Sequence, residues 1–189
     1  MINTRDLPKG KLNIALVGAR IDGQAGVILD ALSYYDNVKV VAFFDNTPNK
    51  INEEINGIPV VGNIDEMTGF DDIKIDAVHV AIGDNKARYD IYKELESMGF
   101  QLLSIIHPSA VISPSAKIGE GCFVGANAVI QNNVIINDYV LINTAALIEH
   151  DNVIGKAVHI APGACTAGRV EIHDLAFLGI GALVVPDVT

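Results

Sequence analysis

The second half of the chain repeats with a period of six residues, and no other feature restricts its fold so strongly. Between Ile112 and Val184, twelve of the thirteen positions spaced by six are Ile, Leu or Val, and Thr166 is the exception. A second series lies four residues after the first; it is small and apolar at eleven of twelve positions, and Asn152 is the exception. Helices repeat about every 3.6 residues and strands every two. A fixed period of six over this length is instead typical of a parallel β-helix.

This period has a simple physical interpretation. Each hexad forms a short strand and a corner, and three hexads form one triangular coil. The large aliphatic side chain points inward and stacks on its equivalent in the next coil, about 4.8 Å away, while the small residue fits the corner. Residues separated by three hexads are therefore predicted to lie directly above one another. An ordinary β-sandwich would keep this phase only by coincidence.

The first half has a different pattern. Apolar runs at residues 12–17, 38–44, 59–61, 77–82 and 101–105 predict strands, and helical spacing covers residues 24–32, 64–67 and 86–98. Strands that are apolar throughout and alternate with helices indicate a parallel sheet covered on both faces. We therefore predict an α/β Rossmann-like domain at residues 1–106, followed by a β-helix of hexapeptide repeats at residues 107–189.

Composition and charge exclude several classes of protein. Among 189 residues, 23 Asp and Glu outnumber 13 Lys and Arg, which gives a net charge of −10. This acidic balance argues against a nucleic-acid partner, which needs a basic face. The sequence lacks the roughly 18-residue apolar run of a membrane span and the features of a secretory signal. Cys122 and Cys165 show neither a disulfide framework nor a metal-ligand spacing. We expect a cytoplasmic protein without membrane insertion.

Five segments resemble one known family. They are Val17-Gly18-Ala19, Phe44-Asp45-Asn46, Ile82-Gly83-Asp84-Asn85, the junction IIHPSAVISPSA and the repeat segment NTAALIEHDNVIG. Over residues 12–189 the chain resembles the bacterial hexapeptide-repeat sugar acyltransferases, in the branch of UDP-4-amino-sugar N-acetyltransferases and sialic acid O-acetyltransferases of surface-glycan pathways. The resemblance implies a left-handed β-helix, a homotrimer, acetyl-CoA as donor and a nucleotide sugar bound by the N-terminal domain. Family members usually continue with another coil and a tail over the pantetheine arm, so a chain ending at Thr189 is expected to bind CoA more weakly.

Acetyl transfer needs a base for the acceptor's proton, a group that orients the base, and donors for the developing oxyanion. His150 lies two residues after an inward position and between Glu149 and Asp151, so we predict that it projects outward as the base, toward a neighbouring subunit. Either carboxylate can orient it. Gly168 follows one coil later and is predicted to lie directly above His150, with its N–H as oxyanion donor. A solvated polar corner and a turn glycine are the simpler interpretations.

Donor binding is predicted from the resemblance. It implies that His159 contacts the thioester end of the donor, near His150 of the next subunit in a trimer. Gly168, Lys156 and Arg169 lie near the same predicted site. The γ-class carbonic anhydrases share this prism and bind zinc through three histidines, two of them close in sequence. His150, His159 and His173 contain no such close pair, so we expect no metal.

Polar and glycine residues at strand ends predict the acceptor site. The turn that follows the first strand is rich in glycine, and backbone N–H groups at a helix N-terminus can hold a pyrophosphate. Ligands collect at the carboxyl edge of parallel sheets. The predicted substrate-binding residues are Gly18, Ala19, Gly23, Gln24, Asp45, Asn46, Gly83, Asp84, Asn85 and Arg88. Plain turn chemistry is the alternative interpretation of this set.

Together these patterns predict an acetyl-CoA-dependent acetyltransferase that acts on the amino group of a UDP-amino sugar, with His150 as general base. O-acetylation of sialic acid or another sugar hydroxyl is the nearest alternative, since the base has the same task. A non-catalytic trimeric nucleotide-binding protein on the same scaffold is an alternative of another class. A nicotinamide-dependent oxidoreductase is disfavoured, because the glycine-rich turn departs from GxGxxG.

Overall fold

The first part of the chain forms a parallel sheet with helices on both faces. The computed structural model describes residues 2–7, 10–47, 50–51, 53–70 and 72–189. The elements of this α/β unit are β2 (Leu12–Val17), α1 (Gln24–Leu32), β3 (Val38–Phe44), β4 (Glu54–Ile55), β5 (Ile58–Gly62), the 3₁₀ helix η1 (Ile64–Gly69), β6 (Ala77–Val80) and α2 (Asn85–Ser97). The strand order is β4-β5-β3-β2-β6, with β5, β3, β2 and β6 parallel.

Alternation along β2 shows how the sheet is covered. Ile14 and Leu16 pack in one cluster with Ile28 of α1, and Ala15 and Val17 pack in another cluster that includes Tyr92 of α2. Both faces of the strand are therefore buried, which explains its uninterrupted apolar sequence. The strands and helices expected between residues 12 and 98 are confirmed with small shifts at their ends.

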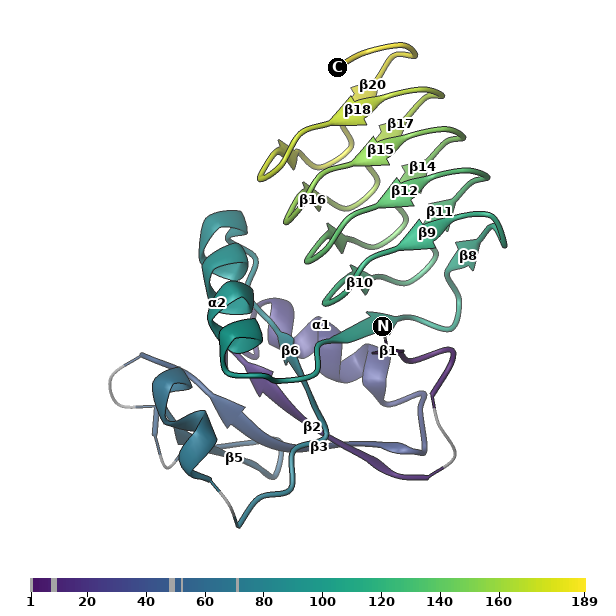
Figure 1. The fold of residues 1–189 in the computed structure, drawn as a ribbon. Helices are drawn as coiled ribbons and strands as arrows, with labels where there is room; N and C mark the ends of the chain where they lie inside the picture. Colours follow the sequence, from purple (N-terminus) through teal and green to yellow (C-terminus); the bar gives the residue numbers. More distant parts are fainter. Residues whose placement is uncertain (1, 8–9, 48–49, 52, 71) are drawn as a thin grey trace.

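The second part is a three-sided left-handed β-helix whose coils rise above the sheet (Figure 1). Its strands are β7 (Leu103–Ile106), β8 (Val111–Ile112), β9 (Lys117–Ile118), β10 (Phe123–Val124), β11 (Val129–Ile130), β12 (Ile135–Ile136), β13 (Leu141–Ile142), β14 (Leu147–Ile148), β15 (Val153–Ile154), β16 (His159–Ile160), β17 (Cys165–Thr166), β18 (Glu171–Ile172), β19 (Phe177–Leu178) and β20 (Leu183–Val184). The three faces are β7-β10-β13-β16-β19, β8-β11-β14-β17-β20 and β9-β12-β15-β18, and β1 (Ile2–Asn3) extends the first through β7.

The stacking confirms the predicted register. Ile130 pairs with Ile148, and Ile142 pairs with Ile160, so that each pair joins equivalent positions of successive coils. The second residue of each two-residue strand of the prism points inward, and most of these side chains, though not Thr166, form one apolar core along the prism. Because every coil repeats the same backbone hydrogen bonds, the fold is specified many times over.

Strand β7 corrects the interpretation of residues 101–105. We expected the last strand of the N-terminal sheet, but β7 pairs with β10 and forms the lowest rung of the prism. Beside the α/β sheet, Val78 forms a bridge with Leu102, which precedes β7, and His79 Nδ1 lies 2.8 Å from the carbonyl oxygen of Leu103. The outward side chains Phe123 and Leu141 of the same prism face belong to the core of the α/β unit, so the two parts share buried surface. The partition at residues 106 and 107 stays a prediction.

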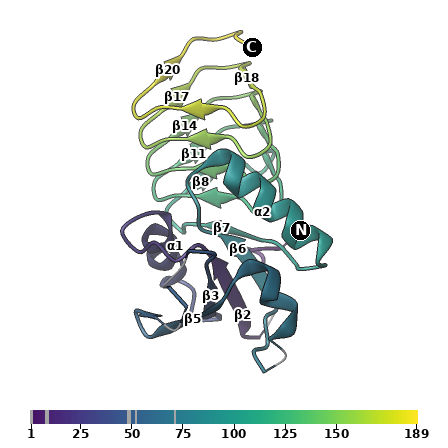
Figure 2. The same cartoon turned by 90° about the vertical axis from the view of Figure 1, so that its left-hand side faces the viewer.

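The α/β unit covers only the lower part of this prism face. Figures 1 and 2 show α2 standing beside the lower coils, with the upper coils extending beyond it. Along the face the outward positions are Phe123, Leu141, His159 and Phe177; Phe123 and Leu141 are buried and Phe177 is 61% exposed. His159 therefore lies at the edge of the covered area.

Candidate active site

The turn after β14 carries His150 outward from the prism. Because Ile148 pairs with Thr166 in register, Gly168 lies one coil beyond His150. A Cβ built on Gly168 would lie 2.5 Å from Cε1 and 2.6 Å from Nε2 of His150, so the imidazole packs against the bare backbone of this glycine. The predicted stacking of these two residues is confirmed.

Asp151, rather than Glu149, pairs with the imidazole. His150 Nδ1 lies 2.8 Å from Asp151 Oδ2, whereas Glu149 Oε2 lies 3.4 Å from the backbone N of His150. Asn133, which sequence reasoning missed, donates to Asp151 Oδ1 at 3.0 Å. The hydrogen bonds from His150 and then Asn133 hold the pKa of Asp151 below its ordinary value. A charged Asp151 keeps the proton on Nδ1, which leaves Nε2, the nitrogen facing Gly168, as an acceptor.

The turn that contains Gly168 presents an unused donor. The N–H groups of Ala167 and Arg169 donate to the carbonyl oxygens of Val184 and His150 at 2.9 and 3.0 Å. Within the described part of the chain, no hydrogen bond uses the N–H of Gly168. An acceptor nitrogen and a free backbone donor thus lie side by side, which is the arrangement that a base and an oxyanion site require.

Lys156 and Arg169, the cations predicted near the donor, both form ion pairs. Lys156 Nζ lies 2.9 Å from Asp138 Oδ2, and Arg169 Nε lies 2.6 Å from Asp187 Oδ1. Their part in binding CoA stays a prediction. Among the described residues, no group of three or more His, Cys, Asp or Glu side chains gathers as a metal-ligand set.

His159 lies where the prism meets the α/β unit. With Phe177 and the loop Gly83–Lys86 it lines a cavity of about 360 Å³, and its ring meets that of Phe177 edge-on at 5.0 Å. Burial, together with the nearby charge of Arg88, lowers the pKa of His159 to about 4, against a hydrogen bond with the Gly83 backbone that acts to raise it. His159 is therefore neutral at pH 7 and can both donate and accept a hydrogen bond.

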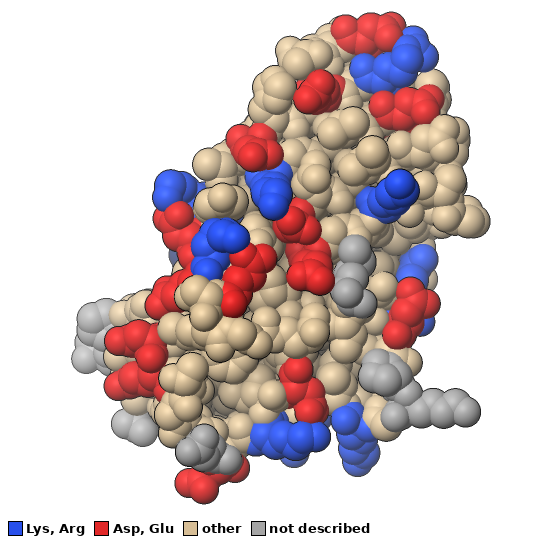
Figure 3. All heavy atoms as spheres, viewed as in Figure 1, with Lys and Arg blue, Asp and Glu red and all other residues tan. Residues whose placement is uncertain are grey.

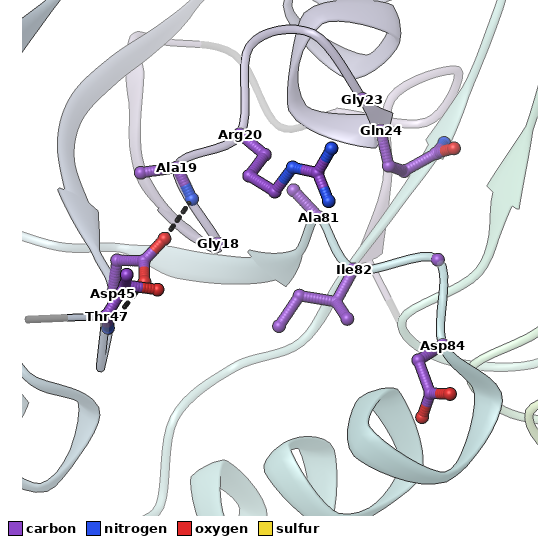
Figure 4. A pocket seen from close by; sticks show the side chains of 11 residues that line it. Gly18, Ala19, Arg20, Gly23, Gln24, Asp45, Thr47, Ala81, Ile82 and Asp84 are labelled. Atoms are coloured by element: carbon purple, nitrogen blue, oxygen red, sulfur yellow. Dashed lines mark hydrogen bonds between the residues drawn. The ribbon is translucent and has the colours of Figure 1, made fainter. Parts of the chain in front are cut away.

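A second cavity opens at the carboxyl ends of β2, β3 and β6 (Figure 4). Its volume is about 450 Å³, and its lining includes Gly18, Ala19, Arg20, Gly23, Gln24, Asp45, Thr47 and Ala81–Asp84. Gly18 has φ +98°, and a Cβ there would lie 2.8 Å from Ile82 Cγ1, so this turn requires glycine. Gln24 Nε2 is buried without a hydrogen-bond partner among the described residues.

Asp45 braces the glycine-rich turn. Its carboxylate accepts from the backbone N of Ala19 at 2.7 Å and of Thr47 at 2.8 Å, and Lys50 Nζ lies 3.7 Å away. Burial acts to raise the pKa of Asp45, but these hydrogen bonds and the Lys50 charge outweigh it, so the pKa lies below its ordinary value. A buried charge at this edge holds the turn in shape, and Figure 4 shows the bond to Ala19.

Three further predicted residues form hydrogen bonds within the protein, and their contact with substrate stays a prediction. Asn46 Oδ1 accepts from Ile64 N at 2.8 Å. Asp84 caps α2 by accepting from Ala87 N at 2.8 Å, although it also lines both cavities. Asn85 Nδ2 donates across to the prism carbonyl oxygens of Leu175 and Ala176.

Arg88 corrects the prediction of a substrate contact. The residue is 2% exposed, and its guanidinium donates to the carbonyl oxygens of Ile82 and Gly83 on one side and of Tyr139, Ala157 and Val158 on the other. It lines neither cavity and instead clamps the cavity loop to the prism. Its spacing of four from Tyr92, which is also buried, is the sequence signal for an inward-facing residue.

The surface seen in Figure 3 carries acidic and basic side chains that alternate, without a continuous basic patch on that face. Among the described helices, none is long and apolar enough to cross a bilayer. Both cysteines are free thiols.

A parallel α/β unit with a cavity at its strand ends, joined to a prism of hexapeptide coils with an outward histidine, defines a hexapeptide-repeat transferase. Two family matches agree. The PglD N-terminal domain matches residues 13–95, and the bacterial transferase hexapeptide family matches residues 104–132 and 115–150.

Solved structures of sugar acetyltransferases are similar over most of this chain. A histidine-to-asparagine variant of perosamine N-acetyltransferase from Caulobacter crescentus, in complex with CoA and GDP-perosamine, is 35% identical with a TM-score of 0.84, over 96% of this chain and 82% of that one. The acetyltransferase domain of PglB from Neisseria gonorrhoeae is 32% identical with a TM-score of 0.81, over 90% and 81%. A structure of that domain with acetyl coenzyme A has a TM-score of 0.76, with 27% identity over 93% and 94%. The chain belongs to the hexapeptide-repeat sugar acyltransferases with a PglD-type N-terminal domain and is an acyltransferase.

Proposed function

We propose that this protein transfers the acetyl group of acetyl-CoA to the amino group of a UDP-amino sugar, in the synthesis of a surface glycan. The observation that carries the proposal is the His150–Gly168 pair, in which an acceptor nitrogen and a free backbone N–H lie together on an outward corner. The neutral amine attacks the thioester carbonyl, and His150 Nε2 takes the proton that the amine loses. The oxyanion forms beside the Gly168 N–H, and the C–S bond then breaks to release CoA, whose thiolate takes up a proton.

The nucleotide sugar is proposed to bind in the cavity between β2, β3 and β6. Gln24 supplies its Nε2, unpartnered among the described residues, as a donor to the phosphates. The backbone N–H groups of Gly18, Ala19 and Gly23 are bonded within the protein, and Asp45 holds this turn in place. The loop Gly83–Asp84 lines both cavities, so a sugar that extends from the nucleotide passes into the cavity beside His159. The Caulobacter protein was solved with a GDP-linked sugar, and the base of the nucleotide is therefore a variable in the assay.

A homotrimer is proposed to complete the site. On the face of β8, β11, β14, β17 and β20 the outward residues are all apolar or Cys: Val111, Val129, Leu147, Cys165 and Leu183. Val111 is 62% and Leu183 81% exposed in the single chain, and burying such a column against another copy is favourable. The turn of His150 follows β14 on this face. A neighbouring subunit packed there would place its His159 near His150 of the first subunit, with acetyl-CoA bound between the two histidines. Free thiols and these two substrates fit the cytoplasm.

The test is release of free thiol from acetyl-CoA with a panel of UDP- and GDP-amino sugars, CMP-sialic acid and free sugars. We expect turnover with an amino-sugar nucleotide. In His150→Ala the turnover rate should fall at least a thousandfold. His173→Ala should keep the wild-type rate, because the His173 side chain is 71% exposed elsewhere on the prism. Turnover only with a hydroxyl acceptor would assign O-acetylation. No binding of acetyl-CoA by calorimetry would favour a non-catalytic role, and full activity in His150→Ala would remove the base.

A further inference from the structure

The two polar residues that interrupt the apolar series of the prism occur at one corner. Thr166 is the inward residue that stacks on Ile148, and Asn152 lies at the end of the turn that follows Ile148. Both are fully buried. One coil below and one coil above Asn152, the same position holds Val134 and Val170. Both departures from the repeat thus lie beside the turns of His150 and Gly168.

The amide of Asn152 connects these two turns. Its Nδ2 lies 2.6 Å from the carbonyl oxygen of Glu149, 2.8 Å from that of Ala167 and 3.2 Å from that of His150. Three carbonyl oxygens around one amide atom require a nitrogen there, which fixes the orientation of the amide. The side-chain oxygen, in contrast, is buried without a hydrogen-bond partner among the described residues.

Comparison with the valines of the neighbouring coils shows what Asn152 contributes. A valine at position 152 would fill the corner as Val134 and Val170 do, without burying an unpartnered oxygen. Packing therefore does not call for asparagine. The hydrogen bonds between the two turns do require asparagine, because only a donor with two hydrogens can bond to carbonyl oxygens of both turns at once.

We propose that Asn152 is a positioning residue for acetyl transfer, which holds the turn Glu149–Asp151 against the turn Ala167–Arg169 and so sets the distance between the His150 ring and the Gly168 N–H. This inference rests on the proposed function. A base and an oxyanion donor supplied by two different coils must keep their separation to within about 0.5 Å. One backbone bond, from Arg169 N to His150 O at 3.0 Å, already joins the two turns. The Asn152 amide adds a side-chain bridge between the carbonyl oxygens of Ala167 and Glu149.

The decisive variant is Asn152→Val, with Val134→Ala as its matched control in the same corner one coil below. Asn152→Val removes the unpartnered oxygen but also the donor to the carbonyl oxygens of Glu149 and Ala167, so we expect a lower melting temperature. The oligomeric state should be kept, while kcat falls at least tenfold and both KM values stay within twofold. Val134→Ala is expected to lower the melting temperature as well but to leave kcat unchanged. If Asn152 acted through stability alone, kcat would fall in both variants along with the melting temperature. A kcat of Asn152→Val within twofold of wild type overturns the proposal.

A second measurement decides the bridge independently of activity. The amide hydrogen of Arg169 donates to the His150 carbonyl across the junction, and we expect its exchange with solvent to become at least fivefold faster in Asn152→Val and to remain unchanged in Val134→Ala. Unchanged exchange in both variants would contradict the bridge. If wild-type protein acetylates no acceptor of the panel, the proposed function fails, and the exchange result still decides whether Asn152 holds the two turns together.

Discussion

Replacing Gly168 by alanine separates the position of the base from the stability of the prism. A Cβ at this residue would lie 2.5 Å from Cε1 of His150, and ordinary contacts begin at 3.4 Å, so the ring must move by about 0.9 Å. The imidazole is 40% exposed and can rotate outward. Gly168 does not have the left-handed φ that disfavours alanine, so the backbone accepts the change, and the loss of glycine stabilises the folded state by about 0.4–1 kcal/mol.

The expected cost falls on the chemical step. A displacement of about 1 Å between reacting groups lowers the rate about 100-fold, which corresponds to about 2.7 kcal/mol of transition-state stabilisation. Stability and activity therefore change in opposite directions. Gly179→Ala is the matched control, because a Cβ there meets nothing within 4 Å and the residue has no left-handed φ.

The assay is thiol release under single-turnover conditions for Gly168→Ala, His150→Ala and the double variant. If the alanine methyl acts by displacing the ring, it has no further effect once the ring is gone, and the two changes couple by about 2.7 kcal/mol. An additive loss in the double variant would instead mean that the methyl blocks the substrate. Wild-type kcat in Gly168→Ala would refute the reasoning, since the ring cannot keep its present place.

Three other variants or conditions test the surrounding structure. Arg88→Lys leaves at least two of the carbonyl oxygens of the clamp without a donor, so we expect a loss of about 3 kcal/mol in the free energy of unfolding. The KM for the nucleotide sugar should rise while the affinity for CoA stays unchanged. An unchanged urea midpoint would contradict the clamp. Burial lowers the pKa values of His79 and His159 to about 4 from 6.5. As the pH falls, the unfolded chain therefore binds protons before the folded chain does, and the free energy of unfolding should decrease between pH 6.5 and 4. A series of urea melts at different pH values measures this, and a free energy of unfolding independent of pH would contradict neutral histidines. Gln24→Ala removes the unpartnered donor of the nucleotide cavity and should raise the nucleotide Kd about threefold to tenfold, whereas equal calorimetric affinity would place Gln24 outside the contact.

Periodicity predicted the features that repeat. The aliphatic residues of the prism keep one phase, which fixes the residues that stack in successive coils. The stacking of Gly168 on His150 therefore followed from counting three hexads along the chain. Likewise, the burial of β2 on both faces followed from its apolar sequence. Such features could be predicted because every coil, or every strand of a covered sheet, obeys the same local rule.

Contacts between the two parts were not predictable in the same way. Arg88 was expected to bind substrate, because it follows a strand end at the edge of the sheet where ligands collect. Only the docking of α2 on the prism shows its carbonyl partners. Strand β7 is a similar case: its local sequence fits either sheet, and the choice depends on whether β6 or β10 supplies the hydrogen-bonding edge. The preference for Asp151 over Glu149 is seen in the distance of 2.8 Å between Asp151 Oδ2 and His150 Nδ1, and sequence adjacency does not reveal it.

The repeat also explains how this chain can tolerate a site that lowers the stability of the fold. Each coil is held by its own ladder of hydrogen bonds, so an unpartnered oxygen at Asn152 or a tightly packed corner at Gly168 weakens one coil among several and leaves the rest intact. Under the proposed function, binding of the acceptor depends on a different structure, the Arg88 clamp that holds the Gly83 loop against His159. Changes in the clamp should therefore act mainly on KM for the acceptor, and changes in the His150 corner mainly on kcat. A mutant of either group that moved both parameters equally would show that the two parts of the site are coupled more closely than their separate supports imply.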